Sequence, residues 1–223
     1  MSVWFSFIAD LFYNNIIWLG KRFKKGGQMR IIAGSARGRK LLSVSTKLMV
    51  KPISDRMKQS LFDILRPKIT ASYFLDLFCG TGSVGVEALS RGAQLVVFAD
   101  NNPACLNVAL KNARAIGCAD RCKTVRADLL GKLDRFKSYA GEEGYDIVYL
   151  GTPYRDSKNN MLSFTGPVLK AVAACGLLAE RGVIVAQHHK TETFAIPGAC
   201  EKFREEKYGD TTMTFLRRAR DPQ

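Results

Sequence analysis

The stretch Asp76-Leu-Phe-Cys-Gly80-Thr-Gly82-Ser-Val-Gly85 decides the fold class of this chain. It carries the pattern G-x-G-x-x-G between residues 73–78, which are predicted to be a strand, and residues 83–91, which are predicted to be a helix. In that position the glycines allow a sharp turn and let a ligand approach the backbone closely. The stretch therefore predicts a cofactor-binding loop in an α/β protein.

Strands and helices are predicted to alternate along the rest of the chain. Apolar strands that alternate with helices indicate a mostly parallel sheet with helices on both faces. The predicted fold is thus a Rossmann-like, doubly wound α/β domain, preceded by a small basic extension. The further predicted elements are strands at 95–99, 123–126, 145–150 and 183–187, helices at 103–115 and 161–175, two strands joined near Gly209-Asp210 within 202–216, a basic hairpin at 30–42 and a helix capped by Ser54 at 54–65.

Three aspartates follow three successive predicted strands and bear on the class of cofactor. Asp76 lies four residues before Gly80, Asp100 lies twenty residues after it, and Asp128 follows the third strand. A carboxylate at Asp76 would repel the pyrophosphate of a dinucleotide but attract the ammonium and sulfonium groups of S-adenosylmethionine. Asp76 and Asp128 also have structural explanations, as a carboxylate bonded to loop amides and as a helix cap. The three acids together favour S-adenosylmethionine, and its predicted contacts are Asp76, Gly80, Thr81, Gly82, Asp100 and Asp128.

Positive charge is concentrated towards one end of the chain. The sequence has 34 Lys and Arg against 20 Asp and Glu, a net charge of +14, and residues 1–72 hold 14 of the basic but only 3 of the acidic residues. Such an arm favours nucleic acid or an anionic membrane surface as a partner, although a basic chain without such a partner is the alternative. The predicted phosphate contacts, which could instead form a solvated face, are Arg37, Arg39, Lys40, Lys51, Arg56 and Lys58.

The cysteines and the first residues bear on the cellular setting. Six cysteines are scattered from Cys79 to Cys200 without a C-x-x-C pair, so no metal site is predicted and a reducing cytoplasm is favoured. Residues 4–19 are aromatic and apolar, but they are fewer than the roughly 20 residues that span a bilayer. A membrane-surface anchor there is less favoured than a mobile extension or a translation start assigned too early, with Met29 as the true start. The protein is expected to be a cytoplasmic monomer.

Several segments resemble one family of RNA-modifying enzymes. Residues 29–41, which read Met-Arg-Ile-Ile-Ala-Gly-Ser-Ala-Arg-Gly-Arg-Lys-Leu, are similar to the opening of the RsmD-type methyltransferases, which modify a guanine N2 of 16S ribosomal RNA. Residues 51–62, 76–93, 188–190 and 208–211 are also similar to that family. The resemblance implies S-adenosylmethionine as cofactor and ribosomal RNA or the small ribosomal subunit as partner. It divides the chain into an extension (1–28), a basic hairpin and helix (29–72), a methyltransferase domain (73–218) and a tail (219–223).

The chain departs from that family at the end of the fourth predicted strand. Family members carry Asp/Asn-Pro-Pro-Tyr/Phe there, whereas this chain has Gly151-Thr152-Pro153-Tyr154, the predicted catalytic loop. In the family motif a side-chain oxygen accepts hydrogen bonds from the amine while the aromatic ring stacks on the base. Gly151 has no side-chain acceptor, and loss of one such group commonly costs on the order of 10²–10³ in rate.

The sequence therefore leaves alternative functions open. The first is methyl transfer to a guanine N2 of small-subunit ribosomal RNA, weakened unless another group such as Asp156 replaces the missing acceptor. The second is a weakened or inactive relative that binds RNA as a ribosome assembly factor, and the third is a nicotinamide-dependent dehydrogenase. His188 and His189 are expected to be a neutral structural pair rather than catalytic.

Overall fold

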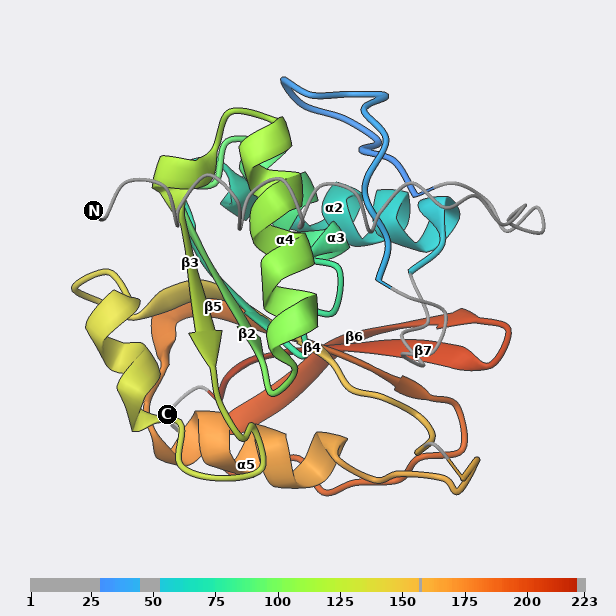
Figure 1. Ribbon diagram of the computed structural model, residues 1–223. Coiled ribbons are helices and arrows are strands. Elements are labelled where there is room, and N and C mark those ends of the chain that lie inside the picture. The colour runs from blue at the N-terminus through green and yellow to red at the C-terminus, as the bar shows by residue number, and fades with distance from the viewer. Residues whose placement is uncertain (1–28, 45–52, 157, 220–223) are drawn as a thin grey trace, which may run out of the picture.

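One seven-stranded sheet organises the residues that the computed structural model describes, namely 29–44, 53–156 and 158–219 (Figure 1). The strand order is β3-β2-β1-β4-β5-β7-β6. The strands are β1 (Tyr73–Leu77), β2 (Leu95–Asp100), β3 (Cys122–Arg126), β4 (Tyr145–Gly151), β5 (Leu178–His189), β6 (Cys200–Tyr208) and β7 (Thr211–Arg218). The helices are α2 (Asp55–Ile69), α3 (Ser83–Ser90), α4 (Pro103–Ala115) and α5 (Thr165–Ala174), with short 3-10 turns η1 (Ala119–Arg121) and η2 (Asp134–Tyr139).

Strands β1 to β5 run parallel, and the pairings that involve β7 are antiparallel. β1 pairs with β2 on one side and with β4 on the other, so the order of strands reverses between β1 and β4. β7 lies between β5 and β6 and runs antiparallel to both. The residues of β1 and β4 are buried along most of their length, which explains why both strands are nearly continuous apolar runs. The predicted doubly wound sheet and its C-terminal hairpin are confirmed.

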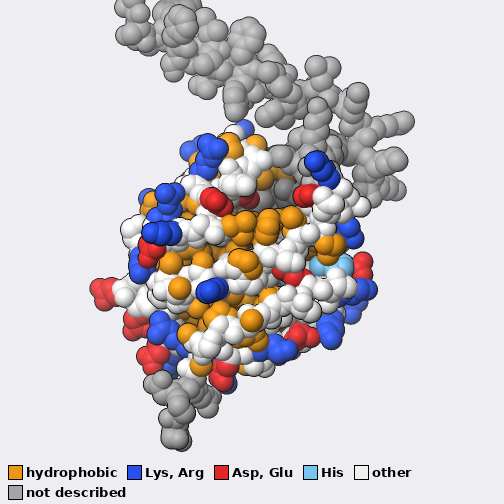
Figure 2. All heavy atoms as spheres, turned by 90° about the horizontal axis from the view of Figure 1, so that it is seen from below, with side chains coloured by type: hydrophobic (Ala, Val, Ile, Leu, Met, Phe, Trp, Pro, Cys, Tyr) orange, Lys and Arg blue, Asp and Glu red, His pale blue; other side chains and the backbone are white. Residues whose placement is uncertain are grey.

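Helices cover both faces of the sheet (Figure 1). On one face α2, α3 and α4 pack in a buried cluster that includes Phe62, Val86 and Phe98. On the other face α5 and η2 pack in a second cluster that includes Val168 and Phe136. Seen from the α5 side, hydrophobic side chains gather in the middle of the surface and charged ones lie mostly towards its edges (Figure 2). Sheets of this kind bind ligands in the loops at the carboxyl ends of the strands.

The start of α5 differs from the prediction, because the helix begins at Thr165 and not within the first residues of 161–175. The preceding segment is held as a loop, since the Leu162 amide donates to the Tyr154 carbonyl at 2.9 Å. The Thr165 amide donates to the buried Glu192 carboxylate at 3.0 Å, which satisfies a free N–H at the start of the helix. That partner lies 27 residues away along the chain. The local sequence pattern therefore gives no signal for it.

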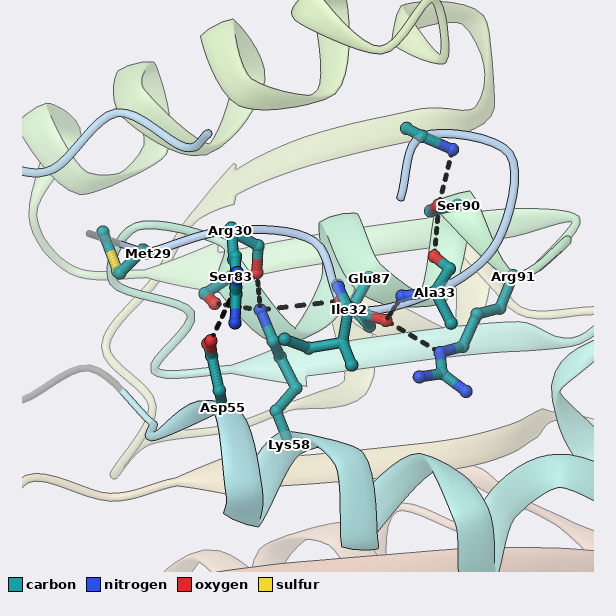
Figure 3. A network of polar contacts seen from close by, with 12 residues as sticks. Met29, Arg30, Ile32, Ala33, Asp55, Lys58, Ser83, Glu87, Ser90 and Arg91 are labelled. Carbon is teal, nitrogen blue, oxygen red and sulfur yellow. Dashed lines mark hydrogen bonds and ion pairs between the residues drawn. The ribbon is translucent and has the colours of Figure 1, made fainter. Parts of the chain in front are cut away.

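A short basic hairpin, residues 29–44, packs against α3 (Figure 3). The predicted hairpin is confirmed by a β-bridge between Arg30 and Lys40 and by hydrogen bonds across it, such as Ile31 N to Arg39 O at 2.9 Å. The hairpin is thus part of the same folded unit as the sheet. Its attachment depends on a buried group of charges.

That group is the Glu87 cluster, which consists of Glu87, Lys58 and Arg91. The Glu87 carboxylate accepts hydrogen bonds from the Ile32 and Ala33 amides at 2.8 and 2.9 Å and from Arg91 Nε at 2.8 Å. Lys58 Nζ lies 3.5 Å from the same carboxylate and donates to the Arg30 carbonyl at 2.6 Å. The cluster therefore joins the hairpin, α2 and α3 at one point (Figure 3).

Candidate functional site

A cavity of about 540 Å³ lies at the carboxyl ends of β1, β2 and β4. Its walls come from the glycine loop, from the end of β2, from the loop that follows β4, and from the end of β5 with the β6–β7 turn. It is next to the point where the strand order reverses, which is the usual ligand position in a doubly wound sheet. Its volume falls within the range of small-molecule and cofactor sites.

The glycine loop shapes one side of the cavity. Gly80 and Thr81, two of the residues predicted to contact the cofactor, line it. Gly82 has a left-handed backbone (φ +71°) at the start of α3, and a Cβ added there would lie 2.6 Å from the Cβ of Ala109 on α4. Gly82 is not among the lining residues, so its structural role is close helix packing and its contact with a cofactor stays a prediction.

Asp76 lines the cavity from the end of β1 and is 1% exposed. Its Oδ2 accepts a hydrogen bond from the Gly85 amide at 3.0 Å. Burial raises the pKa of Asp76 to about 7; the nearby Asp100 also raises it, while the Gly85 hydrogen bond opposes the shift. A cationic ligand beside this carboxylate would favour its ionised form. The alternative explanation of Asp76, a carboxylate bonded to backbone amides, is thus met by one amide, that of Gly85 in α3, and the buried acid still lines the cavity.

Asp100 lines the cavity from the end of β2 and fixes the loops on either side of it. Its Oδ2 accepts from the Gly80 amide at 3.0 Å and its Oδ1 accepts from the Asn102 amide at 2.9 Å. Asn102 in turn caps α4, because its side chain accepts from the Ala104 amide at 2.9 Å. The two predicted acids Asp76 and Asp100 are thus brought together on one wall.

Asp128 lies apart from these two acids. Its side chain is exposed, its Oδ1 accepts from the Leu130 amide at 3.0 Å, and it is not among the residues that line the cavity. No helix starts at Leu129, so the helix cap that the sequence offers as the alternative is not found, and the contact closes a local turn instead. A contact between Asp128 and a cofactor stays a prediction.

Two thiols also line the cavity beside the glycine loop, Cys79 and Cys105. Burial raises the pKa of Cys79 well above its usual value, and the neighbouring Asp76 adds to the shift. Burial and Asp100 raise the pKa of Cys105 to about 11. Both thiols are therefore protonated at neutral pH.

All four residues of the predicted catalytic loop, 151–154, also line the cavity. Thr152 is 3% exposed, and its hydroxyl lies 3.1 Å from Thr165 Oγ1 and donates to the Gln187 carbonyl at 3.1 Å. These contacts join the loop to α5 and β5. The Thr152 hydroxyl is therefore occupied in holding the loop.

A chain of hydrogen bonds crosses the cavity wall behind this loop. The Tyr149 hydroxyl donates to Gln187 Oε1 at 2.5 Å, Gln187 Nε2 donates to the Tyr154 hydroxyl at 2.9 Å, and that hydroxyl donates to Thr211 Oγ1 at 3.1 Å. Burial raises the pKa of both tyrosines, so both hydroxyls are protonated at neutral pH. Gln187 belongs to no motif, so sequence reasoning did not identify it as a site residue. The one available signal is its position at the carboxyl end of the strand predicted at 183–187.

Asp156 does not take the position that the missing acceptor would occupy. Its carboxylate accepts from the Lys158 and Asn160 amides at 2.8 Å each and from Asn160 Nδ2 at 2.9 Å. It is not among the residues that line the cavity. Asp156 shapes the turn after the catalytic loop, and the suggestion that it replaces the missing oxygen is not supported.

The two histidines have different surroundings. His188 is 5% exposed, and its ring nitrogens lie 3.0 Å from Thr214 Oγ1 and 2.9 Å from the His189 carbonyl. Burial lowers the pKa of His188, which agrees with the expected neutral structural role. His189 lines the cavity and meets the Tyr154 ring edge-on, with 5.8 Å between the ring centroids.

Four of the predicted phosphate-binding residues, Arg37, Arg39, Lys40 and Arg56, are exposed. The Arg39 guanidinium also donates to the Ala115 carbonyl at the end of α4. The other three remain accessible to a partner.

The prediction for Lys58 is wrong, and Lys51 lies outside the described residues. Lys58 is 1% exposed, and its ammonium faces Glu87 inside the protein. It therefore cannot reach a phosphate. The basic sequence around Lys58 favours a surface position for this side chain. Its buried partner, Glu87, is 29 positions further along the chain and gives no local signal.

The described ranges 29–44, 53–156 and 158–219 also bear on metal and membrane sites. No group of three or more His, Cys, Asp or Glu in these ranges could hold a metal ion. No helix in these ranges is both long enough and apolar enough to cross a membrane. Residues 4–19, the apolar run noted in the sequence, lie outside the described residues.

Comparisons with known sequences identify relatives over most of the chain. A family model described as "Conserved hypothetical protein 95" matches residues 29–217. The chain is 29% identical over 191 residues to the "Putative rRNA methyltransferase YlbH" of Bacillus subtilis, covering 85% of this chain and 99% of that protein. It is 37% identical over 130 residues to the "Ribosomal RNA small subunit methyltransferase D" of Haemophilus influenzae, covering 57% of this chain and 65% of that protein.

Comparisons with solved structures agree on the fold. The putative methyltransferase yhhF from Escherichia coli matches with a TM-score of 0.68 at 26% identity, covering 86% of this chain and 98% of that one. An RNA methyltransferase from Salinibacter ruber, solved with S-adenosyl-L-homocysteine, matches with a TM-score of 0.56 at 16% identity, covering 78% of this chain and 97% of that one. At that identity the second likeness bears on the fold alone. The fold is the Rossmann-like fold of S-adenosylmethionine-dependent methyltransferases.

Proposed function

The chain belongs to the family described as conserved hypothetical protein 95, the RsmD-type family, and on that premise we propose that it is an S-adenosylmethionine-dependent methyltransferase of ribosomal RNA. The finer proposal is that it methylates the exocyclic N2 of a guanine in small-subunit RNA. The observation that carries the proposal is a single cavity that has two buried aspartates on one wall and the loop with Tyr154 on the other.

The residues on the glycine-loop wall fit S-adenosylmethionine. Asp76 and Asp100 are 1% and 9% exposed, and both line the cavity. A positively charged ligand would therefore compensate the free-energy cost of holding their carboxylates ionised away from water. Among the described lining residues that wall carries no Lys or Arg, and Arg155 lies on the side of the catalytic loop. A pyrophosphate on the glycine loop would meet two carboxylates with no cation beside it. This arrangement supports a methyl donor and speaks against a dinucleotide.

The other wall fits a base presented by RNA. When bound, S-adenosylmethionine supplies a methyl group on a positively charged sulfur. Tyr154 offers a ring on which the guanine stacks, and the Thr152 backbone carbonyl can accept a hydrogen bond from the amine. The nitrogen lone pair forms the new bond to the methyl carbon, the electrons of the broken carbon–sulfur bond stay on sulfur, and one amine proton leaves to solvent.

The basic hairpin supports an RNA substrate. Arg37, Lys40 and Arg56 are exposed on the hairpin and on the start of α2, and Ile53 ahead of α2 lines the cavity. Phosphate contacts from such residues would position an RNA segment without reading its sequence. We propose this surface as the docking site for ribosomal RNA, free or within the small subunit.

The glycine at position 151 favours a second candidate function, that of a relative without methyltransferase activity. It supplies no side-chain oxygen where the resembled motif has one, so a weakened or inactive relative that binds RNA during ribosome assembly is the alternative. Incubation of the full chain with immature small subunits and labelled S-adenosylmethionine separates the two. Label in the RNA supports the enzyme. Retained binding of RNA and cofactor without label supports the assembly factor.

The dehydrogenase alternative is tested by binding. A calorimetric titration with a nicotinamide dinucleotide should show no heat of binding, whereas S-adenosylhomocysteine should bind. Binding of the dinucleotide at micromolar affinity, with none of the thioether, would contradict the proposed cofactor.

A further inference from the structure

The proposed chemistry needs an oxygen that accepts hydrogen bonds from the exocyclic amine, and Gly151 does not provide one. We infer that the side-chain carboxamide of Gln187 supplies this acceptor from the neighbouring strand. The inference rests on the proposed function. It names a catalytic residue that neither the sequence motif nor the similarity to other proteins identifies.

Gln187 stands directly beside the missing group. In the parallel pairing of β4 with β5, Gly151 and Gln187 are register partners. Neighbouring strands lie about 4.8 Å apart, so a side chain from Gln187 can reach the space next to a residue without a side chain. Gln187 and Gly151 both line the cavity, together with the Tyr154 ring. A base stacked on Tyr154 would therefore place its amine beside both positions.

The carboxamide is held in one orientation by its neighbours. The Tyr149 hydroxyl donates to Gln187 Oε1 at 2.5 Å, and Gln187 Nε2 donates to the Tyr154 hydroxyl at 2.9 Å. An amide oxygen has two lone pairs, so Oε1 can accept a second hydrogen bond from the substrate. Donation by Nε2 into a chain that continues to Thr211 polarises the amide and strengthens its oxygen as an acceptor.

The chemical group also matches. The resembled motif carries either Asp or Asn at the position of Gly151, and Gln187 has the same carboxamide as Asn. A fixed, uncharged oxygen can accept from the amine and favour the pyramidal nitrogen that attacks, without removing a proton itself.

The other candidate oxygens near the loop are engaged elsewhere. The Thr152 hydroxyl bonds to Thr165 and to the Gln187 carbonyl. Asp210 lines the cavity, but its carboxylate lies 2.8 Å from Lys190 Nζ and is 62% exposed at the outer edge of the sheet. Asp156 is absent from the lining and shapes its own turn. Gln187 is the acceptor that combines a half-buried, fixed orientation with a place beside Gly151.

The test compares single-turnover methyl transfer to small-subunit RNA by four full-length proteins: wild type, Gln187→Ala, Gly151→Asp and the double variant. Gln187→Ala should lower the rate by about 10²–10³. Adding Gly151→Asp to it should restore at least about tenfold, because an oxygen returns from the other strand. A Cβ at position 151 would lie 3.1 Å from Tyr149 Cε1 and 3.5 Å from the Phe78 carbonyl, so the rescuing side chain needs only a small adjustment.

Two further variants separate an acceptor from a residue that only positions Tyr154. Tyr154→Phe keeps the stacking ring and the Gln187 oxygen but removes the hydroxyl to which Gln187 Nε2 donates, so its rate should fall, but by less than the rate of Gln187→Ala. Gln187→Glu should keep an acceptor but add a pH dependence, with the rate falling as the new carboxyl is protonated. Equilibrium binding of S-adenosylhomocysteine and of RNA should be unchanged in Gln187→Ala.

The outcomes are distinct. A Gln187→Ala rate within threefold of wild type, no rescue by Gly151→Asp, lost ligand binding, or an equal loss in Tyr154→Phe would each overturn the inference. An inactive wild type with an active Gly151→Asp variant would also overturn it, while the proposed methyltransferase function would survive. Inactivity of both, with RNA and cofactor still bound, would overturn the proposed function itself.

Discussion

Lys58 Nζ lies 3.5 Å from Glu87 Oε2, and the two side chains are 1% and 0% exposed. Burial lowers the pKa of Lys58, while the carboxylate of Glu87 opposes the shift. Removal of one partner from a buried pair leaves the other charge uncompensated, which commonly costs about 3–5 kcal/mol. The same carboxylate also holds the hairpin, residues 29–44, through two backbone amides.

Glu87→Gln should therefore lower the free energy of unfolding by about 3–5 kcal/mol, measured by urea denaturation. Hydrogen exchange in residues 29–44 should also become faster, because a weaker acceptor holds the hairpin. The matched control is Asp63→Asn, which breaks the exposed pair with Arg66 and should change stability by less than about 1 kcal/mol. Equal stability of the two variants would contradict the assigned role of the Glu87 cluster.

Cofactor binding should depend on the ionisation of Asp76, whose pKa burial raises to about 7. A bound cation favours the carboxylate, so the free protein holds more protons than the complex and affinity should rise with pH. Between about pH 7.5 and about pH 5.5 the affinity for S-adenosylhomocysteine, which keeps the ammonium, should fall by up to about tenfold per pH unit below the pKa.

Calorimetry in buffers of different ionisation enthalpy should detect a proton released on binding near pH 7. Asp76→Asn should bind more weakly and should lose this slope and the released proton. A slope that persists in Asp76→Asn would assign the titration to another group.

Gly82 should tolerate no side chain, because a Cβ there would lie 2.6 Å from Ala109 Cβ. Gly117 is the matched control, since it has a similar backbone (φ +73° against +71°) but no atom within 4 Å of an added Cβ. Gly117→Ala should cost about 1–2 kcal/mol from the left-handed backbone alone. Gly82→Ala should cost a further 1–3 kcal/mol, approximately, from the overlap of α3 with α4. Thermal denaturation of both variants measures the difference, and equal costs would rule out the overlap.

The hairpin should contribute to RNA affinity mainly through charge. Arg37→Ala with Lys40→Ala should weaken binding and reduce the slope of log affinity against log salt by about 0.7–0.9 for each lost phosphate contact. Lys132→Ala with Lys170→Ala removes the same charge from exposed positions near η2 and on α5, and should change the slope little. Filter binding over a range of salt concentrations compares the two double variants. If the two double variants had the same slope of log affinity against log salt, the hairpin would not be the docking surface for RNA.

The elements that follow local rules were predictable from the sequence. α4 begins where Asn102 caps a helix that has Pro103 in its first turn, and it ends at Ala115 as the prediction has it. The apolar runs of β1, β2 and β4 and the glycine loop also carry local signals, which is why Asp76 and Asp100 could be assigned to one wall.

The features that sequence reasoning missed depend on partners far along the chain. Lys58 is buried because Glu87 comes to lie beside it, and α5 starts at Thr165 because Glu192 accepts its amide. Gln187 becomes part of the site only through the pairing of β5 with β4. Periodicity and spacing report on neighbours within a few residues, so they carry no signal for such contacts.

The two thiols beside the glycine loop place a chemical constraint on this cavity. A reactive alkylating compound stored next to an ionised sulfur would modify the protein that holds it, since the thiolate is the nucleophilic form. Burial beside two carboxylates keeps Cys79 and Cys105 in their unreactive form. The acids proposed to attract the donor would thus also help to keep the two thiols beside it protonated.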